Sequence, residues 1–374
     1  GSVVVDAASD ISVTGIAATG AVGTVDVKTG LLVAVSGVSA TSGIGTVSVQ
    51  TDQVIAVTGL AATGAVGSVT VDAGSVIAVT GLSATSGVGS VVVDATSDIA
   101  VTGLAATGGI GSVSVQTDQV LAVTGIAATG AIGSVVVDAA SDVPVSGLSA
   151  TGGVGSVTVD AGTIVAVTGI AATGSVGSIV VDTASNVPVT GLAATGSVGS
   201  VVVDAASDIA VTGLAATGAV GSVTVQTDQV LAVSGLAATG SVGSIIVLVG
   251  VDISVNGIEA TSAVGSVSVQ TDQVLDVTGL AATGSVGSVV VDASSDIPVT
   301  GIAAVAAVGS VTVTSTNVIA VSGLSATGSS GKVTIWQDIV PTQDPDWQNI
   351  TPGQAADWQD ITPNQVPNWV KIAA

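Results

Sequence analysis

The chain has 374 residues, of which three are lysine or arginine and 26 are acidic, so its net charge is −23. Histidine and cysteine are absent, which removes the commonest general base, the usual zinc ligands and any thiol nucleophile. Isolated lysines cannot form the basic clusters that bind phosphate groups, which excludes nucleic acid as a partner. We therefore expect a protein that is not an enzyme and binds no nucleic acid.

Hydropathy alone would suggest a membrane protein, because its mean value is +0.86. A transmembrane helix needs about 20 consecutive, predominantly apolar residues. Here glycine, serine, threonine or aspartate interrupts every apolar stretch well before that length. We expect no membrane insertion.

A tandem repeat fills the chain from Gly1 to Ser330, as fifteen consecutive units of 22 residues without an insertion or deletion. The first unit reads GSVVVDAASDISVTGIAATGAV and the tenth reads GSVVVDAASDIAVTGLAATGAV. We number the positions of every unit from 1 to 22, so that Gly1 and Gly23 occupy repeat position 1. Such strict length predicts that every unit makes the same structural step.

Two short strands are predicted in each unit. Repeat positions 3 and 5 are always Val or Ile while position 4 varies, a period of two that indicates a strand with one buried face. The polar residues at positions 6 to 10 are typical of a solvent-facing turn. A second strand is expected at positions 11 to 14, where residues such as Val13 and Val35 point inward.

Corners are predicted where small residues recur. Glycine occupies positions 1 and 15 of every unit, as at Gly15, Gly37 and Gly59. A residue without Cβ at a fixed step indicates positive φ or a close approach of two backbones. Position 18 is always Ala, as at Ala18 and Ala40, which predicts a tight corner with room for one methyl group.

These patterns predict an all-β fold, either a β-solenoid or a stacked β-fibre built of fifteen repeats. With one rung per unit the rod would be about 70 Å long, and about twice that if each strand were its own rung. One chain could close its own core, or three chains could share an axis. Because the repeats contain no aromatic residue and the core should be thin, we favour assembly with other chains, such as a homotrimer.

After residue 330 the composition changes, so we divide the chain into a rod at 1–330 and a tip at 331–374. Trp336, Trp347, Trp358 and Trp369 recur every 11 residues, half the step of the rod. We interpret the tip as a cap, because a solenoid must cover its last open edge. An exposed aromatic platform for a glycan or receptor is the alternative.

Carboxylates are the candidate metal ligands. Stacked units would align Asp94, Asp138 and Asp204 at position 6, and Asp98 four residues after Asp94. Such rows could bind Ca²⁺ or Mg²⁺, which prefer several oxygen ligands. We favour a solvated acidic turn, because glutamine interrupts the rows, and we expect no cofactor.

Threonine occupies position 19 in every unit but one, where Val305 replaces it. A regular array of hydroxyl groups on a solenoid could order water, as in ice-binding solenoids. Threonine also simply suits strands and turns, which we consider the better explanation.

Runs such as VTGLAATGAVGSVTV, closed by Trp-x-Asp-Ile-x-Pro segments and the ending PNWVKIAA, resemble the repetitive fibre proteins of marine tailed bacteriophages. The resemblance covers essentially the whole chain. It implies a tail or capsid fibre on the virion surface, often trimeric, that contacts other virion proteins and a glycan or receptor of the host. It carries over no catalytic residue.

The sequence is also compatible with two other functions. The chain could be a subunit of a bacterial extracellular filament or adhesin that polymerises end to end. It could also be an ice-binding solenoid, which is our third candidate.

Overall fold

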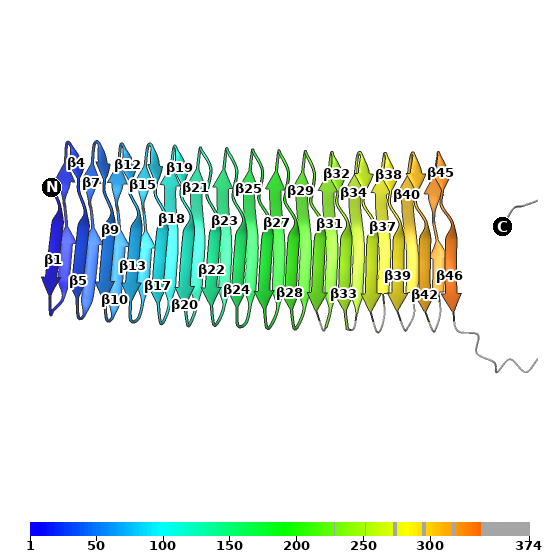
Figure 1. Cartoon of the computed structure of the whole chain (residues 1–374), viewed down its shortest axis with the longest axis horizontal. Helices are drawn as coiled ribbons and strands as arrows, with labels where there is room; N and C mark the ends of the chain where they lie inside the picture. Colours follow the sequence, from blue (N-terminus) through cyan, green and yellow to red (C-terminus); the bar gives the residue numbers. More distant parts are fainter. Residues whose placement is uncertain (228, 251, 272–274, 294–296, 316–318, 338–374) are drawn as a thin grey trace, which may run out of the picture. The chain divides into compact units, whose positions relative to one another are not determined.

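In a computed structural model, the described residues are 1–337 without 228, 251, 272–274, 294–296 and 316–318. All regular elements among them are β-strands, and strands 22 residues apart pair in parallel, for example Val135 with Val157. Each repeat is one rung of a β-solenoid, and the rungs lie side by side along a rod (Figure 1). The predicted solenoid is confirmed, and one rung per repeat selects the shorter length of about 70 Å.

Sheet A contains the first strand of each rung and has sixteen strands in sequence order. Its strands cover positions 3 to 7, two residues beyond the predicted 3 to 5. They are β1 (Val3–Ala7), β5 (Val25–Thr29), β9 (Val47–Thr51), β13 (Val69–Ala73), β17 (Val91–Ala95), β20 (Val113–Thr117), β22 (Val135–Ala139), β24 (Val157–Ala161), β26 (Ile179–Thr183), β28 (Val201–Ala205), β30 (Val223–Thr227), β33 (Ile245–Val249), β36 (Val267–Thr271), β39 (Val289–Ala293), β42 (Val311–Ser315) and β46 (Val333–Gln337).

Sheet B runs in the opposite direction and contains the second strand of each rung (Figure 1). In ten rungs this strand is eight residues long: β18 (Ile99–Ala106), β21 (Leu121–Ala128), β23 (Val143–Ala150), β25 (Val165–Ala172), β27 (Val187–Ala194), β29 (Ile209–Ala216), β31 (Leu231–Ala238), β34 (Ile253–Ala260), β37 (Leu275–Ala282) and β40 (Ile297–Ala304). In five rungs it is split into two: β2 (Ile11–Thr14) and β3 (Ala17–Ala18), β6 (Leu32–Ser36) and β7 (Ser39–Ala40), β10 (Val54–Thr58) and β11 (Ala61–Ala62), β14 (Ile77–Thr80) and β15 (Ser83–Ala84), β43 (Ile319–Ser322) and β44 (Ser325–Ala326).

A third, two-residue strand at positions 21 and 22 closes many rungs and was not predicted. These strands form two five-stranded sheets, β4 (Ala21–Val22), β8 (Gly43–Ile44), β12 (Ala65–Val66), β16 (Gly87–Val88) and β19 (Gly109–Ile110), then β32 (Ser241–Val242), β35 (Ala263–Val264), β38 (Ser285–Val286), β41 (Ala307–Val308) and β45 (Ser329–Ser330). Single bridges from Ile110 to Val242 connect the two. Position 22 is therefore a continuous ladder along the rod.

The glycines at repeat positions 1 and 15 have different structural roles. Position 15 adopts positive φ and position 1 permits a close approach of two backbones, the two roles expected from the sequence. All fifteen glycines at position 15 have φ between 62° and 68°. At this glycine the alternation shifts by one residue, because positions 11 and 13 face inward before it and positions 16 and 18 after it. It therefore acts like a bulge that keeps the chain facing the core. At position 1, a Cβ on Gly155 would lie 2.8 Å from the carbonyl carbon of Gly133, so this glycine permits close stacking.

A single chain buries a hydrophobic core of its own, and the expected assembly with other chains stays a prediction. Sheet A contributes positions 3, 5 and 7, and sheet B contributes positions 11, 13, 16 and 18 from the other side. Position 16, which the sequence analysis overlooked, holds Leu, Ile or Val; Leu104, Ile126 and Leu148 are all 0% exposed. These larger side chains fill the space that a core of Val and Ala would leave.

The predicted inward residues lie where expected. Val13 is 8% and Val35 is 0% exposed. Ala40, which was expected at a tight corner, is the last residue of strand β7 and is 6% exposed. Ala18 is partly buried, because it belongs to the first rung and only one neighbouring rung covers it. Within the described part of the chain, no helix is long and apolar enough to cross a membrane.

Candidate functional site

A groove runs along the rod beside the end of sheet B. It is lined by repeat positions 17, 18 and 19 of fifteen successive rungs and has a volume of about 2110 Å³. Position 18 forms its floor, because Ala106, Ala128 and Ala150 are each 7% exposed and belong to the core. Positions 17 and 19 are exposed on either side of this alanine.

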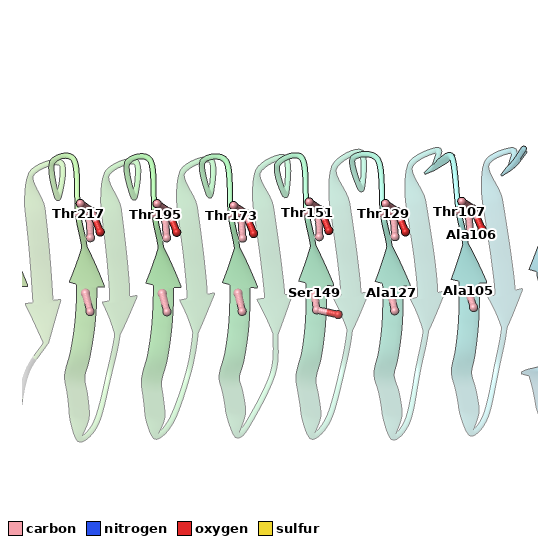
Figure 2. A pocket seen from close by; sticks show the side chains of 18 of the residues that line it. Ala105, Ala106, Thr107, Ala127, Thr129, Ser149, Thr151, Thr173, Thr195 and Thr217 are labelled. Carbon is pink, nitrogen blue, oxygen red and sulfur yellow. The ribbon is translucent and has the colours of Figure 1, made fainter. Parts of the chain in front are cut away.

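The two exposed positions form parallel rows. Figure 2 shows Thr107, Thr129 and Thr151 at equal height in successive rungs, with Ala105 and Ala127 in a second row. Parallel pairing in register produces these rows, because Ala105 pairs with Ala127 and both are at position 17. Neighbouring hydroxyl groups in the threonine row are therefore separated by the rung spacing of about 4.8 Å.

Sequence reasoning found the threonine row but missed the row at position 17. The signal was present, because position 17 is Ala or Ser in every unit but one, where it is Glu259. Such uniformly small residues contrast with the Val, Ile and Leu at the inward positions of the same strand. The groove presents methyl and hydroxyl groups that recur at every rung.

The predicted carboxylate row at position 6 exists on sheet A. Strand pairing places Asp138, Asp160, Asp182 and Asp204 in four successive rungs. All four side chains are exposed. Elsewhere in the row, Gln50 Nε2 donates a hydrogen bond of 3.3 Å to Asp72 Oδ2. Glutamine thus separates the runs of like charge and satisfies a neighbouring carboxylate.

The carboxylates at position 10, to which Asp98 belongs, lie in the turn but not in adjacent rungs, because Val120 and Ile164 follow Asp98 and Asp142 at this position. Asp142 Oδ1 accepts hydrogen bonds from the Thr163 hydroxyl group at 2.8 Å and from the Ile164 backbone N–H at 3.4 Å. Asp10 Oδ1 accepts one from the Leu32 N–H at 3.3 Å in the same way. These aspartates therefore link the turn of one rung to the turn of the next.

The structure brings the metal candidates together only in part. Asp94 pairs with Asp72 on one side and Gln116 on the other, and both Asp94 and Asp98 are exposed. Among the residues that the structure describes, no group of three or more acids has an arrangement that could hold a metal ion. A Ca²⁺ or Mg²⁺ site therefore stays a prediction from the sequence.

We expect Asp160→Asn to raise the thermal unfolding midpoint, because it removes repulsion from Asp138 and Asp182 in the adjacent rungs. The gain should shrink at about 1 M salt, where the screening length falls to about 3 Å. Asp6→Asn is the matched control and should lower the unfolding midpoint, because Asp6 pairs with Lys28, which has the opposite charge. A lower midpoint for Asp160→Asn at low salt would contradict the repulsive row.

The tryptophans of the expected tip lie mostly outside the described residues, and this applies to Trp347, Trp358 and Trp369. Trp336 lies in β46 at repeat position 6, where it pairs with Thr314 of the preceding rung. The solenoid pairing thus continues in register through Gln337, beyond the composition change at residue 330. Cap and platform both stay predictions.

Comparison with known proteins gives no match to a protein-family model, to a curated protein or to a solved structure.

Proposed function

We propose that this chain is a structural fibre protein of a phage virion, a tail or capsid fibre that projects from the particle. The observation that supports it best is the uninterrupted register of sheet A, from β1 to β46. Fifteen equal steps make a spacer whose length is set by the number of repeats. The resemblance of the repeats and the Trp segments to marine phage fibres points the same way.

In this role the protein lies on the virion surface, outside the cell. Its partners are other copies of itself, other virion proteins at one end, and a surface glycan or receptor of the host. The proposal assigns it no catalytic step and no cofactor.

Immunogold electron microscopy tests this proposal. Antibodies raised against the purified chain are applied to particles and cells from a culture infected with the phage whose genome carries the gene. We expect gold on fibres projecting from the particles. Gold on cellular filaments, with bare particles, would overturn the virion role in favour of an extracellular filament.

Ice binding, the third candidate from the sequence, is supported by the exposed rows at positions 17 and 19, which present small and hydroxyl-bearing side chains at a constant spacing. It predicts thermal hysteresis that Thr151→Tyr reduces, since a bulky ring interrupts the row. Ser149→Ala is the matched control, because Ala is the usual residue at position 17. If the chain is only a fibre, neither the wild type nor any of these variants should show thermal hysteresis.

A further inference from the structure

Charge is distributed unevenly around the rung. Between residues 11 and 245, no charged residue occurs at repeat positions 11 to 22 or 1 to 3. The charges of this part of the chain lie at positions 4, 6, 8 and 10, on sheet A and the adjoining turn. They are Asp26, Lys28, Asp52, Asp72, Asp94, Asp98, Asp118, Asp138, Asp142, Asp160, Asp182, Asp204 and Asp208; Asp228, at position 8 of the sequence repeat, lies outside the described residues. The opposite side of the same rungs is neutral.

We call this side the neutral face and define it by positions 12, 14, 17 and 19 of the first eleven rungs, Ser12 to Thr239. Its side chains are partly or fully exposed. They are Ala, Pro or Ser at position 12, Thr or Ser at 14, Ala or Ser at 17, and Thr at 19. The face includes most of the groove, where side chains at positions 17 and 19 recur from rung to rung (Figure 2).

We propose that the neutral face is where a second copy of this chain packs, side by side with the first. Each chain carries a net charge of −23, so contact through the acidic side would place rows of carboxylates against each other. Contact through the neutral face avoids this repulsion. Small side chains also let two β-surfaces approach closely and interdigitate.

The rung spacing identifies the partner as another copy. Two copies have the same period of about 4.8 Å, so their rows can interlock at every rung without accumulating a mismatch. Eleven rungs span about 48 Å, and eight residues of strand span about 26 Å. The resulting area of about 1,200 Å² exceeds the roughly 800 Å² that each partner buries in a stable interface. The uncharged stretch is therefore large enough for stable association.

This inference deepens the self-association part of the proposed function. It can fail while the immunogold result still supports a virion fibre, and it can hold if the chain is a filament subunit instead. Association is therefore tested on the purified full chain in solution.

The test introduces charge into the neutral face. Ala61→Glu, Ala127→Glu and Ala193→Glu are combined in one variant, at exposed position 17 of rungs spaced equally about Ala127. The matched control combines Thr70→Glu, Val136→Glu and Val202→Glu, with the same spacing of 66 residues but on the outer face of sheet A. Masses are measured by multi-angle light scattering, and circular dichroism and the unfolding midpoint verify that each variant is folded.

We expect at least two chains per particle for the wild type and the control, and one chain for the neutral-face variant. A third protein carries lysine at the same three alanines. It should also be a single chain, but it should assemble when mixed with the glutamate variant, because opposite charges then face each other. A single-chain wild type, or a neutral-face variant that assembles like the wild type, would overturn the inference.

Discussion

Gly155→Ala is expected to destabilise the rod strongly, although it adds only one methyl group. The added Cβ would lie 2.8 Å from the Gly133 carbonyl carbon and 2.9 Å from the Ser134 nitrogen. Both atoms belong to the backbone of the preceding rung, so no side chain can rotate away. The two rungs must separate, which weakens the hydrogen bond of 2.9 Å from Gly155 N–H to the Ile132 carbonyl. We expect a loss of about 2–4 kcal/mol in the free energy of unfolding.

Urea unfolding monitored by circular dichroism measures this effect. The matched control is Gly1→Ala, at the same repeat position, where a Cβ would meet nothing within 4 Å. It should leave the midpoint unchanged. Because each rung contacts only its neighbours, the Gly155 defect should also divide the transition into two steps, one for each half of the rod. Equal midpoints for both variants would mean that the rungs do not stack as closely as described.

Leu148→Ala is the second substitution with a large expected effect. Leu148 is 0% exposed and pairs with Ile126 in the adjacent rung. Truncation leaves a cavity in the middle of the core, where the two sheets meet. Removal of a buried leucine side chain typically lowers the free energy of unfolding by about 2–5 kcal/mol.

Its control is the neighbouring Ser149→Ala, which changes an exposed residue to the one found at the same position in the rungs on both sides. The control should unfold at the wild-type urea concentration. If Leu148→Ala did the same, position 16 could not be the centre of the core.

Much of the rung could be predicted because its signals are local. The alternation of Val3 and Val5 around a variable residue identified the first strand, and the invariant glycines identified the places of bending and close approach. Position 7 was missed, because Ala is small and Thr is polar, as in the turn that follows, although Thr117 is only 4% exposed. Its hydroxyl group donates to the Ser97 carbonyl of the preceding rung, a contact that only stacking creates.

The second strand was predicted too short for a similar reason. Gly147 was interpreted as a corner, and a glycine with φ of 66° would end an isolated strand. Every neighbouring rung has the same glycine at the same place, so the bend is shared and pairing resumes at Leu148. The length of a strand and the number of chains that share a core depend on how the rungs stack. The residue pattern within one repeat does not encode this stacking.

The groove, too, could be predicted only in part from the sequence, because it depends on how the rungs stack. Thr129 and Thr151 were recognised as a periodic row, but Ala127 gained meaning only when the strands placed it beside them. The aspartates were recognised as rows without the hydrogen bonds that distinguish their roles. Asp142 receives bonds from the next turn, whereas Asp160 lies between two like charges.

The central claim, one rung for every 22 residues, is tested most directly by distances between spin labels. The chain has no cysteine, so pairs can be introduced at exposed position 4 of sheet A, at Val92 with Val202 and at Val92 with Val290. The distances are measured by pulsed electron paramagnetic resonance. Diluting the labelled chains with unlabelled ones ensures that each distance lies within one chain. With about 4.8 Å per rung, five and nine rungs should give distances of about 24 Å and 43 Å. Distances near 48 Å and 86 Å would mean that each strand is its own rung, and would contradict the solenoid described here.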